Sequence, residues 1–408
     1  MPHPGQCASL SAVLPWQADL GGRTVLQIVP ELEAGGAERT TVDIAAGLAG
    51  AGARALVATE GGRLVAELQA KGGIWIAFPA RTKNPLAMLA NVRRLRSLCL
   101  EEGVDLVHAR SRAPAWSALL ATKTLGIPFV TTYHGSYAGR SAVKTLYNSV
   151  MARGDAVIAN SHYTEELIGR QHPFARDRVR VIYRGTDLRA FSPAAVEPGR
   201  VQALRRAWKV EPGRRIVLLA ARLTSWKGQK LLVEAARRLV DSGIDDLAVV
   251  LAGDPQGREA YVRELDTLVA RLSLGDVVRR VGHCTDMPAA FTAASVVTVP
   301  STEPEAFGRS AVEAQAMGAP VVVSDLGAVP ETVLAPPQVL PGARTGWHVA
   351  AGDAGALAEA IGAALAMGAS ARDALAGRAR AHVEARFSLD RMVSETLDLY
   401  SALLGRDR

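Results

Sequence analysis

The most constraining feature of the sequence is an alternation of short apolar runs with longer helical patterns. From residue 23 onward the runs include TVLQIV (24–29), ALVAT (55–59) and DAVIAN (155–160), and a helical pattern such as 37–50 separates one run from the next. Runs that are apolar at almost every position are typical of strands buried on both faces. Strands of this kind that alternate with helices indicate a parallel sheet covered by helices on both sides. The sequence therefore predicts a doubly wound α/β fold.

The alternation breaks at RGTDLRAFSPAAVEPGR (184–200), which carries two prolines and no apolar periodicity. A second series of strands and helices begins at RIVLLAARL (215–223). We therefore expect two tandem Rossmann-like domains, each with a doubly wound parallel sheet, and a ligand cleft between them. The expected divisions are a poorly structured leader at 1–22, an N-terminal domain at 23–190, a C-terminal domain at 191–385 and a C-terminal helix at 386–408 that packs back toward the N-terminal domain.

Composition indicates a soluble globular protein and limits its partners. The 408 residues include 49% hydrophobic residues and carry a formal net charge of +7. The apolar runs are shorter than a membrane-spanning helix requires, and the N-terminus lacks the basic start and apolar core of a signal peptide. A positive net charge favours an acidic partner such as nucleic acid, an anionic lipid or a phosphorylated small molecule. Because aromatic residues make up only 5% of the chain and are dispersed, nucleic acid is not an expected partner.

The cysteines and the familiar cofactor motifs exclude further classes. Cys7, Cys99 and Cys284 form no CxxC pair, which indicates a reducing cytoplasm. The sequence has no Walker A motif, and GLAGAGA (47–53) follows a helix, whereas a dinucleotide fingerprint must follow a strand. Neither HExxH nor any other metal-ligand spacing occurs. We therefore expect no cofactor and no structural or catalytic metal.

Two glutamates flank a predicted helix start in the second domain. The loop TEPEAFG (302–308) follows an apolar strand, so it lies at a carboxyl end of the sheet, where such folds bind ligands. Glu305 stands just outside the following helix and Glu313 lies in its second turn. Two carboxylates at this spacing suit hydroxyls at the two ends of one ligand. The alternative is an acid that complements the helix dipole and a solvated helix glutamate.

Further positions suit a phosphate. Gly308 and Arg309 fall at the helix N-terminus, where free amides attract an anion. Arg222 ends a strand and Lys227 lies in the loop that follows it, which suits a diphosphate, although two solvated cations are an alternative. Gly35–Gly36 opens a helix in the first domain, either to let the backbone approach a phosphate or sugar or to form a plain tight turn.

Polar residues also follow two strands of the first domain. His134 stands just beyond the run IPFVTTY, where a lone histidine is more often structural than catalytic. The stretch VHARSR (107–112) places His108, Arg110 and Arg112 at an equivalent carboxyl end. Recognition of a phosphate or carboxylate competes there with ordinary surface charge.

Together these residues resemble a known family. The motifs that carry the resemblance are GGAE (35–38), HG (134–135), RGTD (184–187), ARLTSWKGQ (221–229), AGD (252–254) and EAFGRSAVEAQAMGAPVV (305–322). In this order, and over essentially the whole chain from about residue 23, they resemble the retaining glycosyltransferases of family 4, which have the GT-B fold. The resemblance implies a nucleotide diphosphate sugar as donor, held mainly by the second domain. It also implies an acceptor held mainly by the first.

The resemblance gives the motif residues expected roles. The expected donor-binding residues are Gly35, Gly36, Arg222, Lys227, Glu305, Phe307, Gly308, Arg309 and Glu313. Glu305 is expected to bind hydroxyls of the donor sugar and Glu313 those of the ribose, while the cations and loop amides stabilise the departing diphosphate without a metal. His134, close to the transferred sugar, is with Glu305 an expected catalytic residue. One departure is Arg184, where family members often have asparagine.

The acceptor is suggested by a narrower resemblance. HARSRAPAW (108–116) and the segments around Arg184 and Glu305 are most similar to bacterial enzymes that extend the lipopolysaccharide core or related envelope glycolipids. The implied function is transfer of a hexose from a UDP- or GDP-sugar to such a glycolipid. The expected acceptor-binding residues are His108, Arg110 and Arg112. The alternatives are a soluble small-molecule acceptor and a catalytically silent GT-B binding module.

A basic helix suits peripheral contact with a membrane. NPLAMLANVRRLRSLCLEEG (84–103) carries Arg93, Arg94 and Arg96 beside an apolar face that packs either on its own sheet or on an anionic membrane. We therefore expect a cytoplasmic protein that contacts the cytoplasmic face of the inner membrane.

Overall fold

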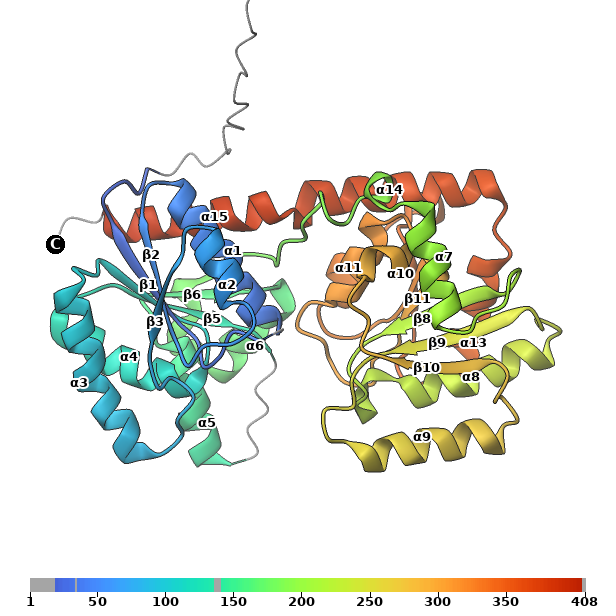
Figure 1. Cartoon of the computed structure of the whole chain (residues 1–408), viewed down its shortest axis with the longest axis horizontal. Helices are drawn as coiled ribbons and strands as arrows, with labels where there is room; N and C mark the ends of the chain where they lie inside the picture. Colours follow the sequence, from blue (N-terminus) through green and yellow to red (C-terminus); the bar gives the residue numbers. More distant parts are fainter. Residues whose placement is uncertain (1–18, 34, 136–140, 406–408) are drawn as a thin grey trace, which may run out of the picture. The chain divides into compact units, whose positions relative to one another are not determined.

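A computed structural model of the chain describes residues 19–33, 35–135 and 141–405 (Figure 1). Its strands form two separate sheets, and the strand pairs found within each sheet are parallel. This confirms the predicted fold class of two doubly wound Rossmann-like sheets. Most of the expected leader lies outside the described residues, and Leu20 near its end is buried.

Among the described residues, the first sheet has seven strands in the order β3-β2-β1-β4-β5-β6-β7. The strands are β1 (Thr24–Ile28), β2 (Arg54–Thr59), β3 (Ile74–Ala77), β4 (Leu106–Ala109), β5 (Phe129–Tyr133), β6 (Ala156–Ala159) and β7 (Val179–Val181). The helices are α1 (Gly36–Gly50), α2 (Val65–Ala70), α3 (Pro85–Glu101), α4 (Arg112–Leu125), α5 (Ala142–Asn148) and α6 (His162–Gln171), with 3₁₀ turns at Ser149–Ala152 and Pro173–Arg178. The strand order reverses between β1 and β4, which makes the carboxyl ends of these strands a switch point where such folds bind ligands.

The second sheet repeats this arrangement, with six strands in the described part of the chain in the order β10-β9-β8-β11-β12-β13. The strands are β8 (Arg215–Ala220), β9 (Leu247–Ala252), β10 (Val278–Gly282), β11 (Ala294–Val299), β12 (Val321–Ser324) and β13 (Trp347–Val349). The helices that follow β7 in the chain are α7 (Pro198–Ala207), α8 (Gln229–Asp241), α9 (Glu259–Arg271), α10 (Met287–Ala293), α11 (Arg309–Ala316), α12 (Val329–Thr332), α13 (Ala354–Leu365), α14 (Ala369–Phe387) and α15 (Leu389–Leu404), with 3₁₀ turns at Pro193–Ala195, Ser225–Lys227 and Pro341–Ala343. Its switch point lies between β8 and β11.

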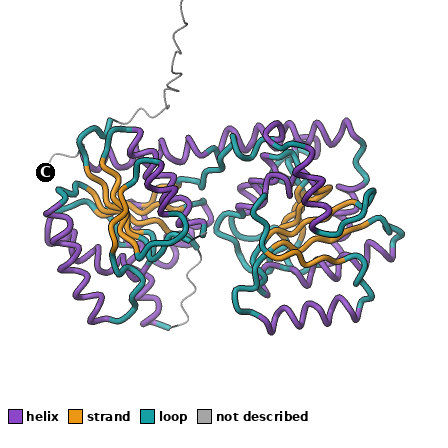
Figure 2. The backbone as a smooth tube through the Cα atoms, in the orientation of Figure 1, coloured by secondary structure: helices purple, strands orange, loops and turns teal. Residues whose placement is uncertain are grey.

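Strand β8 shows why the apolar runs lack polar positions. Val217 and Leu219 pack with residues of α8, α9 and α13 in one buried cluster, whereas Ile216 and Leu218 pack with residues of α10 and α11 in another. The helices accordingly lie on both sides of the second sheet (Figures 1 and 2). Because each fully buried Val, Leu or Ile side chain contributes about 1.5–3 kcal/mol, both faces of the strand must be apolar.

By compactness the chain divides into residues 1–130 with 393–408, and residues 131–392. In the first of these units, Tyr400 of α15 is fully buried and its hydroxyl lies 2.5 Å from Nδ1 of His108 on β4. Gly47 of α1 leaves room for Val393, because a Cβ added at Gly47 would lie 2.2 Å from Val393 Cγ1. Most of α15 therefore packs on α1 and β4. The two sheets and the two compact units divide the chain at different places, so the domain limits expected from the sequence stay predictions.

Among the elements that the sequence pattern did not indicate are α7, α10 and β13. Helix α7 begins at Pro198 inside the stretch that lacks apolar periodicity, and none of its residues is buried. Helix α10 has only seven residues and β13 only three, which is too short for a periodic pattern. A proline at the first helical position was the available signal for α7.

Within the described ranges, no single helix is long and apolar enough to cross a bilayer, although α13 and α14, bent by 110°, pass the length and composition test together. Cys99 is a free thiol, and burial raises its pKa to about 11. Cys7 lies outside the described residues.

Candidate active site

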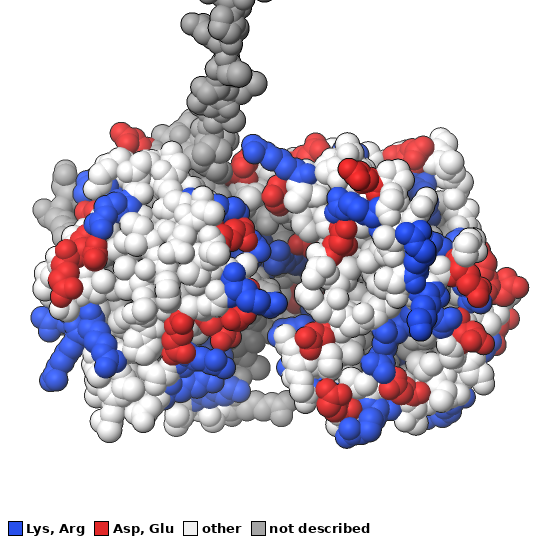
Figure 3. Space-filling model, in the orientation of Figure 1, with Lys and Arg blue, Asp and Glu red and all other residues white. Residues whose placement is uncertain are grey.

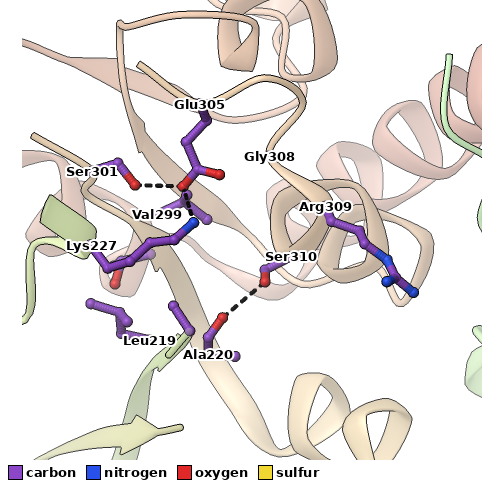
Figure 4. A pocket seen from close by; sticks show the side chains of 11 residues that line it. Leu219, Ala220, Lys227, Val299, Ser301, Glu305, Gly308, Arg309 and Ser310 are labelled. Atoms are coloured by element: carbon purple, nitrogen blue, oxygen red, sulfur yellow. Dashed lines mark hydrogen bonds and ion pairs between the residues drawn. The ribbon is translucent and has the colours of Figure 1, made fainter. Parts of the chain in front are cut away.

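A pocket lies at the switch point of the second sheet (Figure 4). It encloses about 360 Å³, part of it open to solvent. Its lining comes from β8, β11, the loop that follows each strand, and the start of α11: Leu219, Ala220, Ala221, Lys227, Thr298, Val299, Ser301, Glu305, Gly308, Arg309 and Ser310. The carboxyl ends of the two strands thus supply the floor, and the loops supply the polar groups.

An ion pair dominates one side of the pocket. Lys227 Nζ donates to Glu305 Oε1 over 2.6 Å, and the hydroxyl of Ser301 donates to the same oxygen over 2.5 Å. The side chains of Lys227 and Glu305 are only 15% and 10% exposed. Lys227 Nζ also lies 4.2 Å from the centre of the Trp226 ring. A carboxylate held by two donors at one oxygen has its orientation fixed before any ligand arrives.

Gly228 explains why Lys227 reaches this position. Its backbone is left-handed, with φ of 77°, and it ends the 3₁₀ turn that carries Lys227. A Cβ at Gly228 would lie 1.9 Å from the carbonyl oxygen of Pro300, so the turn packs directly against the chain that leaves β11. Glycine is therefore required at this point for two separate reasons.

The start of α11 forms the other side of the pocket. Gly308 caps the helix in a left-handed conformation, with φ of 81°, and Arg309 is the first helical residue. The hydroxyl of Ser310 donates to the carbonyl oxygen of Ala220 on β8 over 2.9 Å, which fixes the helix start against the strand. Because the first amides of a helix have no intrahelical acceptor, this terminus suits a phosphate.

Arg309 and Glu313 form a second ion pair, one turn along α11. Arg309 Nε lies 3.0 Å from Glu313 Oε1, and the Arg309 side chain points away from the Lys227–Glu305 pair (Figure 4). Glu313 is buried, so the alternative of a solvated helix glutamate is wrong. Burial raises the pKa of the Glu313 carboxyl, and Arg309 opposes that rise. The two glutamates of the sequence pair therefore each have a cation of their own.

Two other expected donor residues differ in their surroundings. The Phe307 side chain is buried, with its ring 5.6 Å from the Phe387 ring and 6.3 Å from the Tyr183 ring, and Phe307 is not among the pocket-lining residues. Arg222 is exposed two residues beyond β8 and is not among the pocket-lining residues. Its carbonyl oxygen accepts from Gln229 Nε2 over 3.0 Å.

The two glycines expected to bind the donor sugar nucleotide lie at the start of α1. Gly35 is the N-cap and Gly36 the first helical residue. The Gly35 amide donates to Glu38 Oε2 over 2.5 Å, and a Cβ at Gly35 would lie 2.6 Å from Glu38 Oε1. The absence of a side chain at Gly35 thus lets Glu38 reach back over the helix start.

His134 stands directly after β5 and is partly buried. Nη2 of Arg184 lies 3.2 Å from its Nδ1. The segment 136–140, which follows it, lies outside the described residues.

The expected acceptor residues lie at the switch point of the first sheet. His108 and Arg110 are buried, and Arg110 Nε donates to Gln27 Oε1 over 2.8 Å. Burial lowers the pKa of the Arg110 guanidinium, although Tyr400 and Asp43 oppose this effect. Ordinary surface charge is therefore the wrong interpretation of Arg110. Arg112 is partly exposed and begins α4.

The sequence did not indicate several polar contacts in and around the loop at 302–308. Ser301 and Ser310 line the pocket and orient its walls. Glu331 of α12 accepts from the amides of His162 and Tyr163 and from the hydroxyl of Tyr183, all within 2.8 Å. The available signal was GAVPE (327–331), a glycine turn followed by an acid. Across the described residues, no group of three or more His, Cys, Asp or Glu is arranged to hold a metal ion.

A doubly wound parallel sheet with a polar pocket at its switch point, beside a glycine-capped helix start, is typical of proteins that bind nucleotides. The model of glycosyltransferase family 4 matches residues 34–190, and the model of glycosyl transferases group 1 matches residues 201–382. The chain therefore belongs to the family 4 type of glycosyltransferase, with the GT-B fold.

Individual relatives agree with this assignment. D-inositol 3-phosphate glycosyltransferase of Salinispora tropica is 32% identical over 346 residues, covering 79% of this chain and 69% of the relative. A glycosyltransferase of Rickettsia africae is 32% identical, with a TM-score of 0.85 over 94% of this chain and 99% of the other. Anabaena HepE, solved in complex with UDP-glucose, is 25% identical, with a TM-score of 0.79 over 93% of this chain and 99% of the other.

Proposed function

We propose that this protein transfers a hexose from a uridine diphosphate sugar to a small, soluble, phosphorylated acceptor, with retention of the anomeric configuration. The observation that carries the proposal is the pocket where the Lys227–Glu305 pair faces the start of α11. The UDP-glucose complex of HepE supports a uridine nucleotide, and the name of the Salinispora relative supports an acceptor such as D-inositol 3-phosphate. Neither relative supports the expected lipopolysaccharide acceptor, so the soluble acceptor, left as an alternative by the sequence, is preferred.

The donor-side chemistry is electrostatic. Breaking the bond between the anomeric carbon and the phosphate oxygen leaves the electron pair on the diphosphate. Lys227 and the first amides of α11 provide positive charge for that oxygen from fixed positions, which costs no reorganisation during the reaction. Glu305 then accepts from hydroxyls of the transferred sugar, and Glu313 from those of the ribose. Metal chemistry is not part of this proposal.

Retention is proposed to follow from attack on the same face. The acceptor hydroxyl forms a bond to the oxocarbenium-like anomeric carbon from the side on which the diphosphate leaves. Its proton passes to the leaving phosphate oxygen, so no separate base is needed. His134 contributes a hydrogen bond to the transferred sugar and is not required to remove a proton.

The first sheet contains groups suited to the acceptor phosphate. Arg112 begins the 14-residue helix α4, which directly follows β4 at the switch point. A guanidinium beside the free amides of a helix start is a strong arrangement for a phosphate. We assign the acceptor phosphate to Arg112 and to these amides, with the buried side chains of His108 and Arg110 supporting the loop from beneath.

The function is tested with a matrix of donors and acceptors. UDP-glucose, UDP-N-acetylglucosamine and GDP-glucose are each combined with D-inositol 3-phosphate or unphosphorylated inositol, and nucleotide release and product mass are measured. We expect turnover with a UDP-sugar and the phosphorylated acceptor only. A protein that binds UDP but turns over with neither acceptor contradicts the acceptor class. One that neither binds a nucleotide nor turns over contradicts the function, and an inverted anomer in product NMR contradicts retention.

The outer face of α3 supports a second proposal, peripheral contact with an anionic membrane. Asn91, Leu95 and Cys99 face the core, so one face of the helix packs on its own sheet. On the outer face Leu86, Leu89 and Leu100 are 77%, 58% and 68% exposed. Arg93, Arg94 and Arg96 are also exposed, and no ion pair is found for them among the described residues. Figure 3 shows basic side chains gathered over this helix.

Reversal of these three arginines to glutamate is expected to lower binding to phosphatidylcholine vesicles containing phosphatidylglycerol by at least about 100-fold, because each basic residue near such a surface contributes about 1 kcal/mol. Binding is measured by sedimentation. The matched control reverses Arg258, Arg263 and Arg271, which are also exposed. Arg258 precedes α9 and the other two lie on it, and their reversal gives the same change in net charge. If both triple variants lose vesicle binding equally, net charge alone accounts for the binding, and the outer face of α3 is not a specific membrane contact.

A further inference from the structure

His134 and Arg184 follow two strands of the first sheet that are separated by one strand. His134 comes directly after β5, and Arg184 comes shortly after β7, with β6 between them. Adjacent strands lie about 4.8 Å apart, so the two chains are separated by about 10 Å here. A long side chain is needed to close that gap. Arginine has the required length.

The contact between the two side chains has a defined direction. Arg184 Nη2 lies 3.2 Å from His134 Nδ1 and 3.4 Å from the His134 carbonyl oxygen. A guanidinium has five N–H donors and no acceptor. Nδ1 must therefore be the acceptor, and the proton of the neutral ring is on Nε2. The second contact, to the carbonyl oxygen, holds the guanidinium beside the backbone of the same residue.

Contacts of the two residues after Arg184 fix the backbone from which its side chain extends. The Gly185 amide contacts Met392 Sδ over 3.1 Å, and a Cβ at Gly185 would lie 2.5 Å from Leu389 Cα. Thr186 donates to the carbonyl oxygen of Phe387 over 2.8 Å and accepts from the Leu389 amide over 2.9 Å. The residues that follow Arg184 are thus held against the end of α14 and the first turn of α15.

We propose that Arg184 is a positioning residue that fixes the tautomer and the ring orientation of His134. With Nδ1 engaged by the guanidinium, the ring presents Nε2–H as a hydrogen-bond donor on its other edge. Arg184 thereby becomes a functional part of the site through its contact with His134.

The catalytic consequence rests on the proposed function. If a donor sugar lies at His134, Nε2–H donates to a sugar oxygen, and the ring cannot remove a proton from a hydroxyl at that nitrogen. The hydrogen bond orients the sugar, while the proton of the acceptor passes to the leaving phosphate. The other tautomer would instead place a lone pair at Nε2, which can only accept from a sugar hydroxyl, so the hydrogen bond to the sugar would reverse its direction.

The tautomer is measured directly by ¹⁵N NMR of the whole protein labelled at histidine, without any substrate. The His134 signals are assigned by their loss in His134→Gln. We expect Nδ1 to resonate as an unprotonated nitrogen and Nε2 as a protonated one. This pattern should be lost in Arg184→Met and kept in Arg184→Lys and in the control Arg189→Met, an exposed arginine on the same segment between β7 and α7. A proton on Nδ1 in the native protein, or an unchanged pattern in Arg184→Met, would overturn the proposal.

Kinetics then separate positioning from a merely structural role. Arg184→Met is expected to lower kcat about tenfold, the typical upper effect of one hydrogen bond, with the acceptor KM unchanged. In a His134→Ala background the same substitution should have no further effect, because Arg184 acts through His134. Equal effects in the two backgrounds would contradict the proposal. If the native protein turns over no donor and acceptor, the proposed function is contradicted. The proposed role of Arg184 is still tested, because the NMR experiment needs no substrate.

Discussion

Replacement of Lys227 by methionine is expected to lower kcat about 10²- to 10³-fold, the usual effect of removing one fixed donor that stabilises developing negative charge. Methionine keeps an apolar chain of similar length but removes the ammonium group, which lies 4.2 Å from the centre of the Trp226 ring. The thermal shift produced by UDP should also become smaller, because the Lys227 ammonium is expected to attract the diphosphate of bound UDP as well as the departing diphosphate. The measurements are steady-state kinetics with a UDP-sugar and the melting temperature with and without UDP.

Two controls isolate the charge of Lys227. Lys230 lies on the same segment, is more exposed and pairs with Glu264, so Lys230→Met should leave kcat unchanged. Methionine at 227 leaves Glu305 mostly buried without its cation, which destabilises the site by itself. The double variant Lys227→Met with Glu305→Gln removes that unpaired charge and should recover stability without activity. An unchanged kcat in Lys227→Met would contradict the proposed role.

Gly228→Ala is expected to destabilise the unit that contains it by about 2–5 kcal/mol, from a left-handed backbone and an overpacked contact together. A Cβ at this residue would lie 1.9 Å from the carbonyl oxygen of Pro300, so the backbone of one of the two loops has to move. The movement carries Lys227 away from Glu305. We therefore expect a fall in melting temperature of about 10 °C and loss of the UDP thermal shift.

Gly213 provides a matched comparison for this substitution. Its φ of 85° is close to the 77° of Gly228, but nothing lies within 4 Å of the place where a Cβ would be. Gly213→Ala should cost only the conformational term, about 1–2 kcal/mol, and should keep the response to UDP. If the two alanine variants lose equal stability and both respond to UDP, the contact with Pro300 does not position Lys227.

The sheets could be predicted because their signal is local. A strand buried on both faces is apolar at successive positions, as in β8, and this pattern needs no knowledge of distant residues. The same reasoning failed for α7, which buries none of its residues and so carries no apolar stripe. It also failed for β13, whose three residues are shorter than any usable period. Local pattern thus predicts the buried framework better than the elements at its edge.

The part of the candidate site around the start of α11 could be predicted from the sequence. The places of Glu305, Gly308 and Glu313 relative to α11 could be read from their spacing. The Lys227–Glu305 pair could not, because 78 residues separate its members and the contact depends on how closely Gly228 approaches Pro300.

The contacts of His108 could not be predicted from the sequence either. Its hydrogen-bond partner Tyr400 lies 292 residues further along the chain, on a helix that no local feature of VHARSR indicates. The sequence places His108 at the carboxyl end of a strand as a candidate for acceptor binding, whereas it lies within β4 and is fully buried. Long-range packing decides whether such a residue meets solvent.

The packing of α15 has a consequence for protein engineering. Residues 393–404 complete the compact unit that contains β1 to β4, with Tyr400 against His108 and Val393 in the space left by Gly47. A chimera that takes residues 19–130 from this protein and its remaining sequence from a relative would set a foreign helix against these positions. Segments that lie farthest apart in the gene must therefore be exchanged as a set, and a single crossover between parents separates them.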